Sequence, residues 1–150
     1  LILQIAGLIR DETNLVGILA NVSAALHDAF PERFFWVGFY LQENGNMLRL
    51  GPFQGSVACY VIPFGKGVCG KAWEEERTLI VPDVEKFPGH IACSSLSRSE
   101  IVVPMYDDTH TFRGVLDIDS TRLNDFDEDD KEGLGRIIDL LMEETQDLFL

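Results

Sequence analysis

The sequence is poor in basic residues, and this scarcity limits the partners that it can bind. It has 12 Lys and Arg residues against 25 Asp and Glu residues, which gives a formal net charge of −13. Nucleic acids and anionic membrane surfaces bind proteins through an excess of Lys and Arg. We therefore expect neither a nucleic acid nor a membrane as a partner.

Long apolar runs and abundant cysteine are also missing. No apolar stretch approaches the ~20 residues that a helix needs to cross a bilayer, and no secretory signal region stands at the start. Three cysteines in 150 residues do not make a secreted disulfide scaffold. These absences predict a protein of the reducing cytoplasm.

The remaining composition is that of a folded domain. Hydrophobic residues make up 46% and charged residues 25% of the chain, as in average globular proteins. A chain of this length corresponds to about one domain and can bury most of its apolar surface in a single core. Because we find no internal repeat or low-complexity linker, we predict one domain over residues 1–150.

The order of the expected elements favours an α+β fold. Apolar residues at helical spacing predict a helix over 14–30, which Pro31 ends, and a closing helix over 129–149. Aromatic and β-branched runs predict strands at 34–41, 47–53, 57–62, 78–81, 101–105 and 112–118, with a short helix near 68–75 and an irregular stretch at 84–99. The sequence Asn-Gly-Asn at 44–46 predicts a hairpin turn between the first two strands. We expect both terminal helices on one face of a mostly antiparallel sheet and the irregular middle on the other.

All three cysteines lie beside glycines, prolines or small residues, where the backbone can turn tightly or approach a ligand. A structural cysteine more often lies within a periodic apolar segment. Three is an odd number, so at least one of Cys59, Cys69 and Cys93 stays unpaired within the chain. Two interpretations remain open: three buried, inert thiols, or a nucleophilic thiol whose sulfenic acid is resolved by a second thiol.

A zinc site is a third interpretation, because His90 and Cys93 are three residues apart. With two cysteines upstream, the count matches a Cys3His site, but no Cys-x-x-Cys pair is present. We therefore expect no bound metal.

Acidic residues mark two strands near their ends. Asp117 and Asp119 alternate with apolar residues, so both point to the same face of a strand, and Glu100 precedes the apolar run 101–103. One interpretation is a solvated face of the sheet. The other is a pocket lined by carboxylates, in which like charges held close raise at least one pKa and leave a proton donor near neutral pH.

Two further patterns have simpler interpretations. The acidic run 125–130 lacks the spacing of a calcium-binding loop, and we expect it to cap the last helix. Trp36 and Tyr40 are four residues apart on one face of a strand, which suits either core packing or a pocket wall.

Five segments, in order, resemble the free methionine-(R)-sulfoxide reductases, a family of GAF-fold enzymes. They are GPFQGSVAC, IPFGKGVCGKAW, VPDVEKFPGHIAC, SEIVVP and GVLDIDS. The resemblance implies a GAF-like central antiparallel sheet of about six strands, with the terminal helices on one face and ligand-enclosing loops on the other. It also implies reduction of free L-methionine (R)-sulfoxide rather than of sulfoxide within proteins.

The same resemblance assigns roles to the cysteines. Cys93 would attack the sulfoxide, and Cys59 would resolve the sulfenic acid as a disulfide, with Cys69 as an alternative resolver. Thioredoxin, kept reduced by an NADPH-dependent thioredoxin reductase, would be the external reductant, and no cofactor would be bound. Many relatives have an Asp directly after the attacking cysteine, where this chain has Ser94.

The resemblance also implies a substrate site. Glu100, Asp117 and Asp119 would line the sulfoxide and amino-acid positions, and Trp36 and Tyr40 would hold the methyl end. Two other functions stay open, a GAF sensor that binds a small ligand without chemistry and a thiol peroxidase. The sequence leaves both a monomer and a homodimer open.

Overall fold

A computed structural model describes residues 1–149, and its elements follow one another as in an α+β fold. Helices open and close the chain, and six strands lie between them. The elements are α1 (Ile2–Ile9), α2 (Leu15–Ala29), β1 (Trp36–Glu43), β2 (Met47–Gln54), β3 (Val61–Pro63), α3 (Gly67–Glu75), β4 (Leu79–Val81), the 3-10 turn η1 (Val84–Lys86), β5 (Ser99–Tyr106), β6 (Phe112–Ser120), α4 (Glu128–Thr145) and η2 (Gln146–Leu148).

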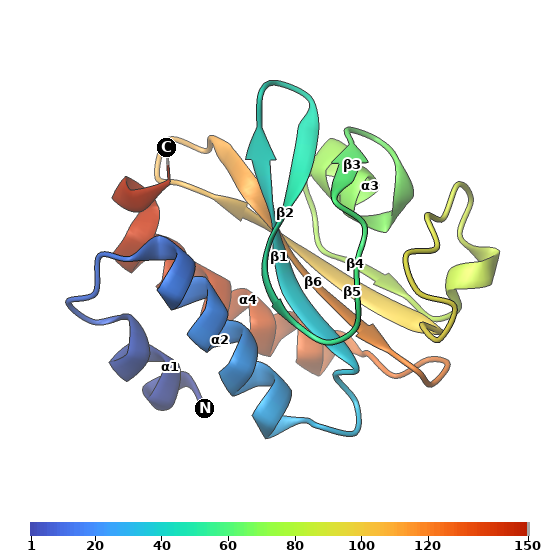
Figure 1. The fold of residues 1–150 in the computed structure, drawn as a ribbon, viewed down its shortest axis with the longest axis horizontal. Coiled ribbons are helices and arrows are strands. Elements are labelled where there is room, and N and C mark those ends of the chain that lie inside the picture. The colour runs from blue at the N-terminus through green and yellow to red at the C-terminus, as the bar shows by residue number, and fades with distance from the viewer. Residues whose placement is uncertain (150) are drawn as a thin grey trace.

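The six strands form one antiparallel sheet in the order β3-β2-β1-β6-β5-β4. The hairpins β1–β2 and β5–β6 supply its centre, and β1 pairs with β6 between them. Figure 1 shows α1, α2 and α4 together on one side of the sheet, and α3 with the segment after β4 on the other. The predicted α+β architecture, with terminal helices on a single face, is confirmed.

The sheet is buried on both faces because two apolar clusters cover it. The larger cluster lies between the sheet and the helices, where Leu26 and Leu141 pack with strand residues such as Phe39 and Leu116. The smaller cluster lies on the opposite face and contains Trp36, Tyr40, Val68, Cys69 and Val102. Since alternate residues of a strand point to opposite faces, β1 contributes Phe39 to one cluster and Tyr40 to the other.

Most of the expected elements are present, with two corrections. The prediction of a strand over 57–62 is wrong for 57–60, where the chain is irregular and exposes the side chains of Val57 and Tyr60, and β3 begins only at Val61. Helix α1 was not expected at all. It has no side-chain cap at either end that could mark it in the sequence, and Ile5 and Ile9 attach it to the core.

The caps of the two long helices follow the sequence. The side chain of Asn14 accepts a hydrogen bond from the Gly17 amide at 3.3 Å where α2 begins. At α4, Asp127 and Asp130 form a reciprocal capping box, with amide-to-carboxylate distances of 2.9 and 3.0 Å. The acidic run therefore satisfies the free amides of the first turn, as predicted. Within residues 1–149, no helix combines the length and apolar character needed to cross a membrane.

Candidate active site

A disulfide between Cys59 and Cys93 links two irregular segments on the face of the sheet opposite α1, α2 and α4. The two residues are 34 positions apart in the sequence, and their Cα atoms are 5.3 Å apart. Cys59 precedes β3, and Cys93 precedes β5. Cys69, in the first turn of α3, is buried and is the free cysteine of the described chain. The structure therefore contains the Cys59–Cys93 pair that the family resemblance implied.

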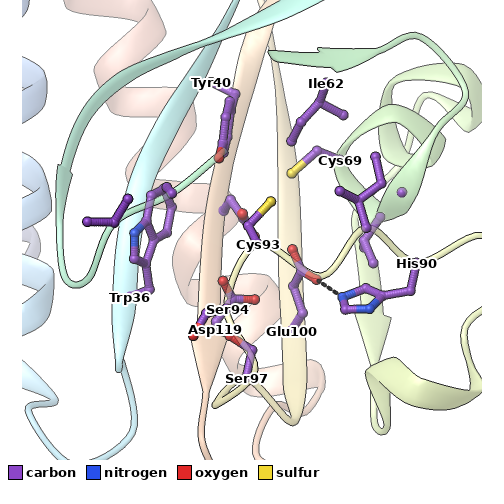
Figure 2. A pocket seen from close by; sticks show the side chains of 16 residues that line it. Trp36, Tyr40, Ile62, Cys69, His90, Cys93, Ser94, Ser97, Glu100 and Asp119 are labelled. Atoms are coloured by element: carbon purple, nitrogen blue, oxygen red, sulfur yellow. Dashed lines mark ion pairs between the residues drawn. The ribbon is translucent and has the colours of Figure 1, made fainter. Parts of the chain in front are cut away.

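A pocket lies beside this disulfide, and Figure 2 shows its lining. The space inside is about 40 Å³, which is room for only a few water molecules. Every site residue predicted from the sequence lines this pocket, except Cys59, which is bonded to one that does. The predicted residues in the lining are Trp36, Tyr40, Cys69, Cys93, Glu100, Asp117 and Asp119.

Strand pairing brings the three carboxylates together. Glu100 of β5 lies directly opposite Asp119 of β6, and Asp117 shares the face of Asp119 two residues earlier. The side chains of Glu100 and Asp117 are almost fully buried, with residue exposures of 6% and 5%. For these two residues, the interpretation of the acids as a solvated sheet face is wrong.

Burial also changes the proton affinity of this cluster. Desolvation raises the pKa of Glu100 and of Asp119 well above the usual carboxyl range, and the charge of Asp117 raises both further. Burial raises the pKa of Asp117 too, although hydrogen bonding toward Glu100 and the Cys69 thiol offsets part of this effect. The cluster therefore holds at least one proton at a pH where an exposed carboxyl has lost it.

The Cys69 thiol belongs to the same buried group. Burial raises its pKa well above the ordinary thiol value, and the charges of Asp117 and Glu100 add to the effect. Ligand atoms of Cys69, Glu100 and Asp117 lie within 4.8 Å of one another, so these residues, rather than His90 with the paired cysteines, are a set that could hold a metal ion. A thiol with so high a pKa is a poor nucleophile, because the reactive species is the thiolate.

Trp36 and Tyr40 form one wall of the pocket and also hold the segment that carries Cys59. Their rings stack with centroids 5.9 Å apart. The Trp36 indole N–H donates to the carbonyl oxygen of Ser56 at 3.0 Å, and the Tyr40 hydroxyl donates to the carbonyl oxygen of Cys59 at 3.0 Å. This anchoring of the 55–60 segment was not expected from the sequence, because the residues it joins are far apart in the chain.

His90 is a further pocket residue whose place the sequence did not predict. Its Nε2 atom lies 4.0 Å from Glu100 Oε1, and its side chain is 16% exposed. The sequence suggested this residue only as a metal ligand. The sequence did contain a signal for this placement, because His90 is three residues from Cys93. A segment that places a thiol at a pocket also places its neighbouring residues near that pocket.

Comparison with known proteins places the chain in a family. Residues 10–142 match the model of the GAF domain. The free methionine-R-sulfoxide reductase of Saccharomyces cerevisiae is 44% identical over 146 residues, which cover 94% of this chain and 81% of that protein. The chain belongs to the free methionine-(R)-sulfoxide reductases of the GAF family.

Two further proteins are more similar to this chain than the yeast enzyme is. GAF domain-containing protein A of Dictyostelium discoideum is 59% identical over 138 residues, covering 92% of this chain and 85% of that protein. The X-ray structure of free methionine-R-sulfoxide reductase from Neisseria meningitidis in complex with its substrate is 50% identical, with a TM-score of 0.92. It matches 97% of this chain over 86% of its own length, so the GAF fold is shared almost throughout the described residues.

Proposed function

We propose that this chain reduces free L-methionine (R)-sulfoxide to methionine through a cysteine sulfenic acid and the Cys59–Cys93 disulfide. The observation that carries the proposal is the position of this disulfide. One of its sulfurs belongs to a residue that lines a pocket with three carboxylates, two of them buried, in a chain of the reductase family. Thiolate chemistry and proton donation are the two requirements of sulfoxide reduction, and this pocket combines groups suited to both.

In the first step, the Cys93 thiolate attacks the sulfur of the substrate. The oxygen leaves that sulfur poorly unless it is protonated, so a carboxylic acid of the cluster donates a proton to it. The bond between the two sulfurs and the sulfur–oxygen bond of the substrate then break as the hydroxyl group passes to the Cys93 sulfur, which leaves methionine and the Cys93 sulfenic acid. The raised pKa of Glu100 and Asp119 supports the cluster as the proton source.

In the second step, the Cys59 thiol condenses with the sulfenic acid. A new sulfur–sulfur bond forms, and the oxygen leaves as water. The Cα separation of 5.3 Å between Cys59 and Cys93 lies within the usual range for such a bond. Cys69 is disfavoured as the resolving thiol, because burial raises the pKa of its thiol and because Cys93 is bonded to Cys59 instead.

In the third step, an external dithiol reduces the disulfide and becomes a disulfide itself. Thioredoxin is the proposed reductant, and the cycle needs no bound cofactor. The 40 Å³ space of the disulfide-bonded pocket is too small for an amino acid, so the segments that carry Cys59 and Cys93 must separate after reduction. Opening of this kind is common where loops enclose a small substrate.

Turnover with defined substrates tests the proposal. Methionine release is measured with free methionine (R)-sulfoxide and with its S epimer, and oxidation of the dithiol reductant is measured with these two substrates and with a hydroperoxide. We expect turnover of the R epimer and little of the other two. A higher rate with hydroperoxide would identify a thiol peroxidase, and binding of a small ligand without any turnover would identify a GAF sensor.

A further inference from the structure

The thiol that the disulfide leaves free lies beside two buried carboxylates. The Sγ atom of Cys69 and carboxylate oxygens of Glu100 and Asp117 lie within 4.8 Å of one another. The exposures of these three residues are 3%, 6% and 5%. His90 and Asp119 line the same pocket but lie outside this set. The set therefore shares only Cys69 with the Cys3His arrangement that the sequence suggested.

Three elements bring the donor atoms together. Val102 of β5 pairs with Asp117 of β6, so Glu100, two residues before Val102, is a diagonal neighbour of Asp117 on the same face of the sheet. Helix α3 packs over these two strands and carries Cys69 in its first turn. It lies so close to the end of β3 that a Cβ on Gly70 would be 2.5 Å from the Pro63 carbonyl oxygen. Close packing therefore fixes the backbone that presents the thiol.

Asp117 has an acceptor atom that the protein does not use. Its Oδ1 atom is buried and has no hydrogen-bond partner within residues 1–149. Buried carboxylate oxygens are normally satisfied by a donor or an ion. Because Asp117 lines the pocket, a ligand in the pocket space is the available partner for this oxygen.

The size of the pocket limits what that ligand can be. Its space of about 40 Å³ is too small for an amino acid but is sufficient for one ion with a water molecule, since a water needs about 10–15 Å³ of such space. Figure 2 shows the Cys69 sulfur and the Glu100 carboxylate directed into this space from α3 and β5. The disulfide form of the protein therefore combines a small cavity with three converging donor groups.

The donor set favours zinc. Zn²⁺ binds cysteine sulfur and carboxylate oxygen in tetrahedral sites, whereas Mg²⁺ and Ca²⁺ take oxygen ligands and do not favour a thiolate. Because Zn–S bonds of about 2.3 Å and Zn–O bonds of about 2.0–2.2 Å set tetrahedral ligand atoms roughly 3.5 Å apart, the donors need to approach one another by roughly 1 Å. A divalent cation also offsets the repulsion among like charges that are buried together.

We propose that Cys69, Glu100 and Asp117 form a Zn²⁺ site in the disulfide form of the protein, with water as the fourth ligand. One Zn–S bond and two Zn–O bonds form, and the protons held by the thiol and the carboxyl groups pass to the solvent. No electron is transferred, so the step needs neither an oxidant nor a reductant. The ion fills the pocket space, so zinc and a small-molecule ligand exclude each other. This inference does not rest on the proposed reduction, because it needs only the disulfide and the buried donors.

Cobalt is the spectroscopic probe for this site, because Co²⁺ replaces Zn²⁺ in tetrahedral sites and absorbs light through its bond to sulfur. The chain has three cysteines, and with Cys59 and Cys93 bonded, a sulfur-to-cobalt absorption band can come only from Cys69. We expect this band to saturate at one equivalent of Co²⁺ in the oxidised protein. One equivalent of Zn²⁺ should abolish the band, and an excess of Mg²⁺ or Ca²⁺ should leave it. Absence of the band at millimolar cobalt would overturn the inference.

Substitutions assign the ligands, with zinc affinity measured by calorimetry. Cys69→Ser should abolish the cobalt band and weaken zinc binding more than about 100-fold, beyond the 10- to 100-fold that loss of an outer-shell partner costs. Glu100→Gln and Asp117→Asn keep the thiol but should each weaken zinc binding by at least about 10-fold. The matched control is His110→Gln, which removes an exposed histidine 3.1 Å from Glu76, a surface pair able to take zinc adventitiously. It should leave the band and the affinity unchanged.

A band that persists in Cys69→Ser, or an affinity loss in His110→Gln as large as in Asp117→Asn, would identify surface binding and overturn the inference. If Cys69→Ser does not fold by circular dichroism, the zinc affinity of Asp117→Asn relative to the parent protein decides. The proposed reduction is judged separately. Zinc binding at Cys69 in a protein that reduces no sulfoxide overturns only that reduction, and an active reductase without the cobalt band overturns only the zinc site.

Discussion

Replacement of Glu100 by glutamine tests the proton source of the proposed reaction. The substitution keeps the size of the side chain and removes the acidic proton. Glu100 is 6% exposed and shares the pocket with Asp117 and Asp119, so bulk water has little access to its carboxyl group. We expect the rate of methionine release to fall about 10²- to 10⁴-fold, the usual contribution of a general acid.

The assay is a single turnover without reductant, in which methionine is measured per enzyme as a function of pH. Burial raises the pKa of Glu100, so the wild-type rate should fall as pH rises through that raised value, and the Glu100→Gln rate should lose this dependence. The matched control is Glu85→Gln, an exposed carboxylate in the segment between β4 and β5. A near-normal rate in Glu100→Gln, Asp117→Asn and Asp119→Asn alike would refute the carboxylate cluster as the proton source.

The same substitution has a predictable effect on stability. A carboxyl whose pKa is raised on folding stabilises the protein at low pH, and this contribution is lost as pH rises through the folded-state pKa. For wild-type protein, the free energy of unfolding should therefore decline toward alkaline pH, where Glu100 must ionise beside Asp117 and Asp119. The Glu100→Gln variant lacks this penalty, so its denaturant midpoint at alkaline pH should exceed that of wild type. The opposite order would contradict the direction of the pKa shift.

The other predictions concern the cysteines, the size of the substrate and the start of α4. Cys93→Ser should release no methionine in a single turnover, while Cys59→Ser should release about one equivalent and then stop; a full equivalent from Cys93→Ser would show that another thiol attacks. An N-acetylated and amidated methionine sulfoxide should be reduced far more slowly than the free amino acid, because it has neither charge for the pocket to bind; comparable kcat/KM values for the two would contradict this. Asp127→Ala should lower the free energy of unfolding by about 1 kcal/mol in urea denaturation, since it removes the N-cap of α4. The control is Asp139→Ala, which replaces an exposed acid in the middle of the same helix. Equal losses of unfolding free energy in the two variants would exclude a capping effect.

Periodic segments were the part of the fold that the sequence predicted well. The turn at 44–46 and the alternation around Asp117 and Asp119 identified β1, β2 and β6 to within a few residues. Both signals are local, because a positive φ at Asn44 and Gly45 or a two-residue alternation is visible within a few positions. The placement of Glu100 opposite Asp119, in contrast, is a property of the strand register and came only from the family resemblance.

The errors arose where long-range contacts decide the local structure. The aromatic and β-branched residues of 57–60 favour a strand, but Cys59 is bonded to Cys93 and its carbonyl oxygen accepts a hydrogen bond from the Tyr40 side chain, so this segment follows these distant partners and forms no strand. Single-sequence patterns contain no information on such partners. The same reason explains His90, whose neighbour Glu100 is ten residues away in the chain, beyond an irregular segment.

The small size of the disulfide-bonded pocket has a consequence for the kinetic order of the reaction. With about 40 Å³ of space, the oxidised protein has no room for methionine sulfoxide, so in the proposed cycle the substrate and the reductant bind to different forms of the enzyme. Such an enzyme follows a ping-pong scheme, with parallel lines in double-reciprocal plots of rate against substrate at several reductant concentrations. In the proposed cycle, a high concentration of methionine sulfoxide would therefore neither trap the oxidised form nor slow its reduction by the dithiol.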